Sequence, residues 1–226
     1  MTQRGLDQKD MVKVADIIAD VLLACKPYSV ETRQGPAARA KIDFSVLEDA
    51  KARVNALAEK AGADLSVEKH GYPHFFYLND TFEGKNGWVA LDLSGAQVRP
   101  FVSYVFTSDT EALQAGQSQN TRLITPKGTL DGVITCVSES GYRFSIPEKS
   151  AGLAATWLRD LSDGYTAFDA EPIRRLPGPI YITESKAEPV TKADGNPICE
   201  TKPYHVGMIG HAGQALPRFE WKEVES

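Results

Sequence analysis

The feature that most constrains the fold of this chain is a change of hydrophobic period near Gly62. Before this glycine, apolar residues recur three and four positions apart, the spacing of amphipathic helices. After it, apolar and polar residues alternate over short runs, as they do in strands with one buried face. A chain whose leading helices are followed by a strand-rich stretch is expected to have the α+β fold class.

The first predicted helix covers residues 7 to 24. Asp7 is expected to cap its N-terminus, and the helix ends before Pro27 because the residue preceding a proline avoids the α conformation. One face carries the apolar residues Met11, Val14, Ala15, Ile18, Val21 and Leu22.

A second helix is predicted from Ser45, whose hydroxyl forms a capping box with Glu48. It ends at Gly62, the expected C′ residue. Residues 27 to 41, between the two helices, are interpreted as a loop. The two helices resemble the closing helical layer of another fold, so the first segment of the molecule is expected to span residues 1 to 62.

Beyond a linker at residues 63 to 86, the pattern predicts an α+β domain at 87 to 165 and a β-rich tail at 166 to 226. The predicted strands are 87–93, 121–125, 129–137, 142–146, 180–184, 204–209 and 219–224. A helix that includes Val98 and Phe106 tolerates Pro100 in its first turn. Another helix, from about 150 to 161, is expected to end at Gly164.

Composition excludes several classes of protein. The 226 residues, 42% of them hydrophobic, can bury a core, but no apolar run is long enough to span a membrane. A net charge of -5 argues against nucleic acid as a partner. Cys25, Cys136 and Cys199 lack Cys-x-x-Cys spacing, which indicates reduced thiols and no zinc site. With no secretory signal visible, the expected location is the cytoplasm.

The N-terminus resembles the last part of serine hydroxymethyltransferase. The resemblance is carried by Thr2-Gln3-Arg4-Gly5-Leu6, the acidic cap and the helix that follows. It implies that the remainder of such an enzyme is a partner. It also implies that pyridoxal phosphate belongs only to the intact parent enzyme, because this chain contains no Thr-Thr-His-Lys segment for the Schiff base.

A second resemblance, over roughly residues 87 to 162, is to the folate-binding domain of the glycine-cleavage aminomethyltransferase (T protein). The matching stretches are 91–95, 101–106, 108–109, 113–116 and 123–131. The resemblance implies tetrahydrofolate as cofactor and an aminomethyltransferase-like fold. In place of the family's paired aspartates this chain has Asp131-Gly132, so a single carboxylate remains at that point.

Four residues are therefore candidates for folate binding. By the resemblance, Asp131 would contact the pterin or the transferring nitrogen, although an aspartate in a hairpin is commonly a turn residue. Arg99 and Arg122 could hold a carboxylate in a bidentate fork. Tyr104 could stack on the pterin ring, although helical spacing also suits a core position.

Other polar residues are assigned structural roles. Asp109 is expected to cap the next turn, Arg143 to lie on a solvated strand face, and Trp88 to pack or to stack on the pterin. His70, His74, His205 and His211 are interpreted as structural, and no metal site is expected. Catalytic residues are not identified.

Two functions follow from these observations. In the first, the chain is part of a glycine/serine one-carbon transferase that uses tetrahydrofolate. In the second, it is a non-catalytic folate-sensing or scaffolding module of the same pathway, which the single carboxylate at Asp131 favours.

Overall fold

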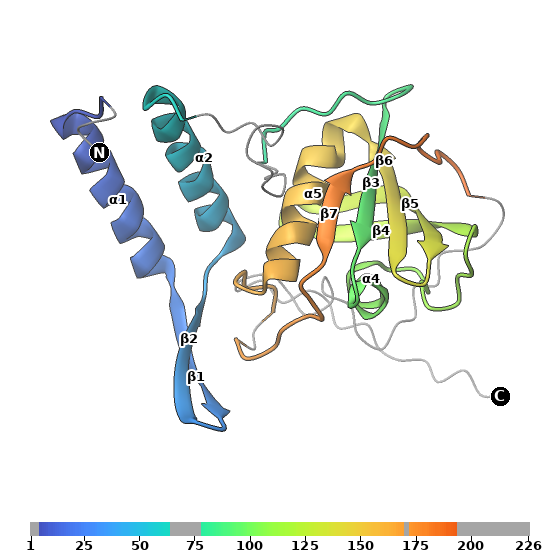
Figure 1. Cartoon of the computed structure of the whole chain (residues 1–226), viewed down its shortest axis with the longest axis horizontal. Helices are drawn as coiled ribbons and strands as arrows, with labels where there is room; N and C mark the ends of the chain where they lie inside the picture. The colour runs from blue at the N-terminus through green and yellow to red at the C-terminus, as the bar shows by residue number, and fades with distance from the viewer. Residues whose placement is uncertain (1–4, 64–77, 170–171, 194–226) are drawn as a thin grey trace.

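The computed structural model describes residues 5–63, 78–169 and 172–193. As expected, the fold class is α+β: a helical hairpin at the N-terminus stands beside an antiparallel sheet with its own helices (Figure 1). The predicted strands at 204–209 and 219–224, the four histidines and Cys199 lie outside the described residues.

The N-terminal part consists of α1 (Gln8–Ala24), β1 (Lys26–Thr32), β2 (Gly35–Lys41) and α2 (Phe44–Lys60). The predicted loop at 27–41 is wrong, because β1 and β2 pair along their whole length in antiparallel register, from Lys26 opposite Lys41 to Thr32 opposite Gly35. Gly35, with a φ of 104°, provides the left-handed residue that the tight turn needs. The β-hairpin reverses the chain, so α2 runs back beside α1 (Figure 1).

Side chains fix where both helices begin. The Asp7 carboxylate accepts a hydrogen bond from Asp10 N at 2.9 Å and Asp10 accepts one from Asp7 N at 3.0 Å, which confirms the predicted cap. The predicted Ser45 cap is wrong: α2 starts one residue earlier, and Asp43 Oδ1 accepts from Ser45 N at 2.9 Å. Gly62 follows the end of α2 with a φ of 68°, as a C′ glycine should.

The second part is a five-stranded antiparallel sheet in the order β4-β5-β6-β3-β7. Its elements are β3 (Trp88–Ser94), α4 (Val98–Val105), β4 (Ser118–Thr125), β5 (Gly128–Ser138), β6 (Gly141–Pro147), α5 (Glu148–Asp163) and β7 (Tyr181–Glu184). Each agrees with a predicted element to within a few residues. Gly164 ends α5 in the left-handed conformation, with a φ of 75°.

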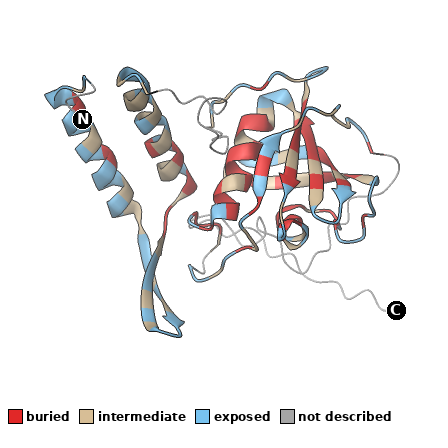
Figure 2. Cartoon of the chain, viewed as in Figure 1, coloured by how far each residue is buried: buried red, intermediate tan, exposed pale blue. Residues whose placement is uncertain are grey.

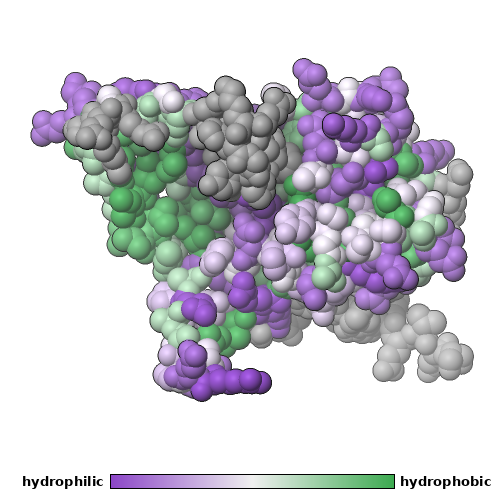
Figure 3. Space-filling view, in the orientation of Figure 1, coloured by the Kyte–Doolittle hydropathy of each residue, from purple (hydrophilic) through white to green (hydrophobic). Residues whose placement is uncertain are grey.

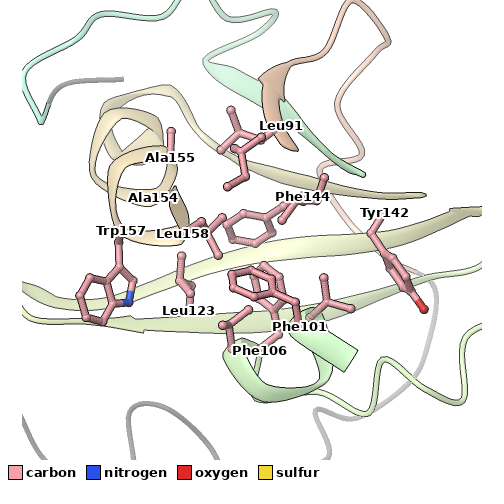
Figure 4. Close-up of a cluster of buried hydrophobic side chains, with 14 of the residues drawn as sticks. Leu91, Phe101, Phe106, Leu123, Tyr142, Phe144, Ala154, Ala155, Trp157 and Leu158 are labelled. Atoms are coloured by element: carbon pink, nitrogen blue, oxygen red, sulfur yellow. The ribbon is translucent and has the colours of Figure 1, made fainter. Parts of the chain in front are cut away.

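The hydrophobic core lies between one face of this sheet and the helices α4 and α5. Burial is concentrated in the sheet, α4 and α5, whereas α1 is largely exposed (Figure 2). In the close-up, Phe101 from α4, Phe106 directly after that helix and Leu158 from α5 meet Leu123 and Phe144 of the strands (Figure 4). Phe82, from the segment predicted to be a linker, is also buried in this cluster.

The two parts meet where α2 packs against α5. The Phe44 ring, fully buried, lies edge-on to the Trp157 ring with centroids 5.1 Å apart. The Trp157 indole N–H also donates to the carbonyl of Ile124 at 2.9 Å. This contact places α2 between α1 and the sheet domain, with α1 on the outside (Figure 1).

Candidate functional site

Asp131 and Arg122 face each other across the β4–β5 ladder. Arg122 Nε donates to Asp131 Oδ1 at 2.9 Å, and the two side chains are 42% and 79% exposed respectively. Their neighbours Leu123 and Leu130 point to the core, so the pair lies on the opposite, outer face of the sheet. The sequence candidates Asp131 and Arg122 therefore form one exposed polar contact.

The outer face around this pair is polar. Asp92 and Arg143 form an ion pair at 2.7 Å on the same face, as expected for the alternation of β6. Residues 185–193 cross this face as a strap: Val190 N donates to Ser145 Oγ at 3.0 Å. At the end of the strap, Ala193 N donates to Asn120 Oδ1 at 3.4 Å. Asn120 lies on β4, two residues before Arg122. A planar polar ligand lying beside the strap would find carboxylate, guanidinium and amide groups together.

Arg99 and Tyr104 lie on α4, which packs on the core side of the sheet. Arg99 Nη2 donates to the carbonyl of Glu111 at 2.7 Å, and Tyr104 is 39% exposed. Because α4 and the Arg122–Asp131 pair belong to different sides of the sheet, the structure does not bring the four candidates into one site. Asp109 has the turn role that the sequence predicts, since it accepts from Glu111 N at 3.2 Å.

The packing around Gly132 excludes a second carboxylate next to Asp131 in β5. A Cβ atom built on Gly132 would lie 2.5 Å from the Phe144 ring and 2.6 Å from the Ser145 carbonyl oxygen. Contacts this short with backbone and a fully buried ring leave no room for a side chain. The aspartate of the resembled family's pair therefore has no place here.

A buried charge cluster at the α2–α5 contact was not found from sequence. Lys51 Nζ donates to Glu48 at 2.6 Å and to Asp160 at 2.5 Å, and both carboxylate side chains are at most 3% exposed. Burial, followed by the hydrogen bond with Glu48, raises the pKa of Asp160 to about 7, against the attraction of Lys51. One oxygen of each carboxylate is buried without a hydrogen-bond partner. The Asp160 carboxyl therefore keeps its proton to a higher pH than an exposed aspartate does.

Sequence spacing could indicate only half of this cluster. Glu48 and Lys51 are three residues apart on one helix, a recognisable pair. Asp160 comes from α5, 109 residues away from Lys51, and only the packing of the two helices brings it there. Such a group can exchange a proton near neutrality, but its burial indicates a structural role at this contact.

Lys41 is a second buried cation that was missed. It is 2% exposed, its ammonium donates to the Arg174 carbonyl, and it lies 4.3 Å from the centre of the Phe168 ring. Burial lowers its pKa, and the charges of Arg175 and Arg174 lower it further, whereas Asp169 opposes the shift. Lys41 thus ties the end of β2 to the chain after α5.

Neither a metal-binding cluster nor a membrane-spanning helix is found among the described residues. No cluster of three or more His, Cys, Asp or Glu side chains could hold a metal ion within the described ranges. In the same ranges, no helix has the length and apolar character needed to cross a bilayer.

Comparisons with known proteins show only a weak structural similarity. No protein-family model matches the chain, and no curated protein matches it. Solved structures with a match include a crystal structure of glycine cleavage system aminomethyltransferase T from Bartonella henselae, with a TM-score of 0.34 and 17% identity. The match covers 43% of this chain and 24% of the other, so the chain spans about a quarter of that protein's length. A likeness this low identifies neither a family nor an activity.

Proposed function

We propose that this chain is a folate-binding module of glycine/serine one-carbon metabolism, and that the Arg122–Asp131 pair on the outer face of the sheet contacts the folate. The proposal rests on the resemblance of residues 87–162 to the folate-binding domain of the T protein. The observation that carries it is the exposed ion pair formed by two of the candidate residues.

The chemistry of the pair suits folate. A guanidinium binds the carboxylates of the glutamate tail, and a carboxylate accepts hydrogen bonds from the N–H groups of the pterin ring. An exposed ion pair contributes at most about 1 kcal/mol, so a ligand can replace the Arg122–Asp131 contact at little cost. Without a second carboxylate, the module is proposed to bind folate and to take part in transfer only within a larger assembly.

Calorimetric titration of the full chain with tetrahydrofolate tests this proposal. A hydrogen bond to a charged group contributes roughly 1.5–3 kcal/mol, so Asp131→Asn is expected to weaken binding about tenfold or more. The matched control is Asp109→Asn, which changes an aspartate that serves a turn and is expected to leave affinity unchanged.

Either of two results would contradict the proposal: no measurable affinity in the parent chain, or the same affinity in Asp131→Asn. Tyr104→Ala tests whether folate binds on the α4 side of the sheet instead of on the outer face. If Tyr104→Ala weakens binding and Asp131→Asn does not, folate binds on the α4 side of the sheet, with Arg99 as its neighbour.

The alternative function, a non-catalytic folate-sensing or scaffolding module, is favoured by two other observations. The packing around Gly132 excludes the second carboxylate of the resembled family, and α1 presents exposed apolar residues to solvent. Absence of folate binding together with a specific protein contact through α1 would support the scaffolding role instead.

A further inference from the structure

Helix α1 carries two seams, each with the spacing of a coiled-coil heptad. The inner seam faces α2 and is buried or half-buried; its residues are the apolar Val14, Ile17, Val21 and Ala24, preceded by Asp10, which pairs with Lys60 of α2. The outer seam consists of Met11, Ala15, Ile18 and Leu22, which are all exposed. A helix within a four-helix bundle needs one seam for each of two neighbours, whereas α1 has a single neighbouring helix here.

Helix α2 repeats the arrangement. Its outer seam consists of Leu47, Val54, Ala58 and Ala61, with Lys51 at the heptad position between the first two. Val54 is 51% exposed, and the other three apolar residues are half-buried. With α1 and α2 antiparallel, helical geometry turns both outer seams to the same side of the hairpin. Figure 3 shows this side as a continuous hydrophobic surface over the two helices. On this surface Ile18 and Leu22 are 54% and 67% exposed.

Charged side chains between the two helices lie on the other side. Arg53 bridges Asp20 at 2.8 Å and Asp49 at 2.9 Å. Lys13 and Asp16 line a cavity of 230 Å³ between the helices, together with Arg53 and Lys60. The hairpin as a unit is therefore amphipathic. The one charged residue within the heptad of the two outer seams is Lys51, and its ammonium is held by Glu48 and Asp160.

We propose that the outer seams of α1 and α2 are a homodimer interface, in which the hairpins of two copies stack face to face into a four-helix bundle. A second copy supplies two antiparallel helices of the same length with the same heptad spacing. Because Lys51 is paired with Glu48 and Asp160 and the other residues of the seams are uncharged, the two-fold symmetric contact opposes no unpaired like charges.

The size of the face fits this partner. Each helix has 17 residues and is about 25 Å long, and two helices side by side are about 20 Å wide. Each hairpin thus offers on the order of 500 Å², and two copies together reach the roughly 1,000 Å² that a specific interface needs.

Sedimentation equilibrium of the full chain tests the proposal. The wild type is expected to sediment at twice the monomer mass of 24.7 kDa at micromolar concentrations. Ile18→Lys places two lysines in the interface and is expected to raise the dissociation constant of the dimer by at least about tenfold. The control, Ala52→Lys, adds the same charge at an exposed position of α2 away from the outer seam, and should stay dimeric.

Circular dichroism establishes that each variant is folded; if Ile18→Lys is not, Val54→Lys on the partner seam takes its place with the same expectation. A wild type that remains monomeric up to about 100 µM overturns the proposal, since the face is then covered by another segment or by a different protein. A dimer that persists in both Ile18→Lys and Val54→Lys overturns it as well.

Discussion

Asp160 shows how tertiary packing changes the chemistry of a single residue. On an isolated helix this aspartate would ionise near pH 4. In the fold it is 2% exposed and lies beside Glu48, and its pKa rises to about 7. The folded state therefore holds the proton more tightly than the unfolded state does between these two pH values.

The contribution of Asp160 to stability is complete below about pH 4 and is lost as pH rises through about 7. Asparagine cannot ionise and can donate a hydrogen bond to Glu48. The free energy of unfolding of the wild type should fall as pH rises from 5 to 8. Asp160→Asn is expected to make this fall smaller, by roughly 2 kcal/mol. Urea unfolding at several pH values measures this. Identical pH profiles for the variant and the wild type would show that Asp160 is ionised throughout.

Among the elements, α2 shows how the start of a helix is chosen. Asp43 and Ser45 are both good capping residues, and sequence alone does not distinguish them. The preference for Asp43 follows from β2, which delivers an extended chain at Asp43, with a ψ of 138°. Phe44 then becomes the first helical residue and points into the contact with Trp157.

Replacement of the true cap should cost more than replacement of the predicted one. Asp43→Ala is expected to lower the free energy of unfolding by about 1 kcal/mol, because Ser45 N loses its acceptor. Ser45→Ala should change it by only a few tenths of a kcal/mol. Urea denaturation followed by circular dichroism compares the two, and a larger effect of Ser45→Ala would place the helix start as the sequence predicted it.

For the whole molecule, two sets of contacts join the hairpin to the sheet domain. Phe44 packs edge-on to Trp157 and Lys51 bridges to Asp160, which links α2 to α5. Ile42, just after β2, exchanges backbone hydrogen bonds with Tyr165 and Ala167, so the hairpin is anchored through β2 and α2 while α1 remains on the outside. This arrangement holds the outer seams of both helices away from the sheet domain.

Phe44→Ala should test this anchor. A buried phenylalanine replaced by alanine costs about 3–5 kcal/mol through lost contacts and the cavity that remains. Tyr181→Ala, an aromatic residue that is 67% exposed, serves as the control and should cost less than about 1 kcal/mol. Urea unfolding of the full chain gives both values; a small effect of Phe44→Ala would mean that the two parts are stable independently.

The sequence by itself determined the elements whose signals are local. Hydrophobic periodicity located α1, α2 and α5, and alternation located β3 to β7, because each pattern arises within a few neighbouring residues. Asp7, Gly62 and Gly164 marked helix ends for the same reason. The β1–β2 hairpin was missed because Pro27 and Pro36 suggested a loop, although a two-stranded ribbon tolerates proline at its edges.

Only the tertiary structure decided which of the candidate groups meet. It paired Arg122 with Asp131, placed Tyr104 on the other side of the sheet, and closed position 132 to any side chain. It also divided the predicted apolar face of α1: α2 covers the side with Val14 and Val21, whereas the side with Ile18 and Leu22 is left exposed. Periodicity identifies an apolar face, but what covers that face depends on contacts between residues far apart in the chain.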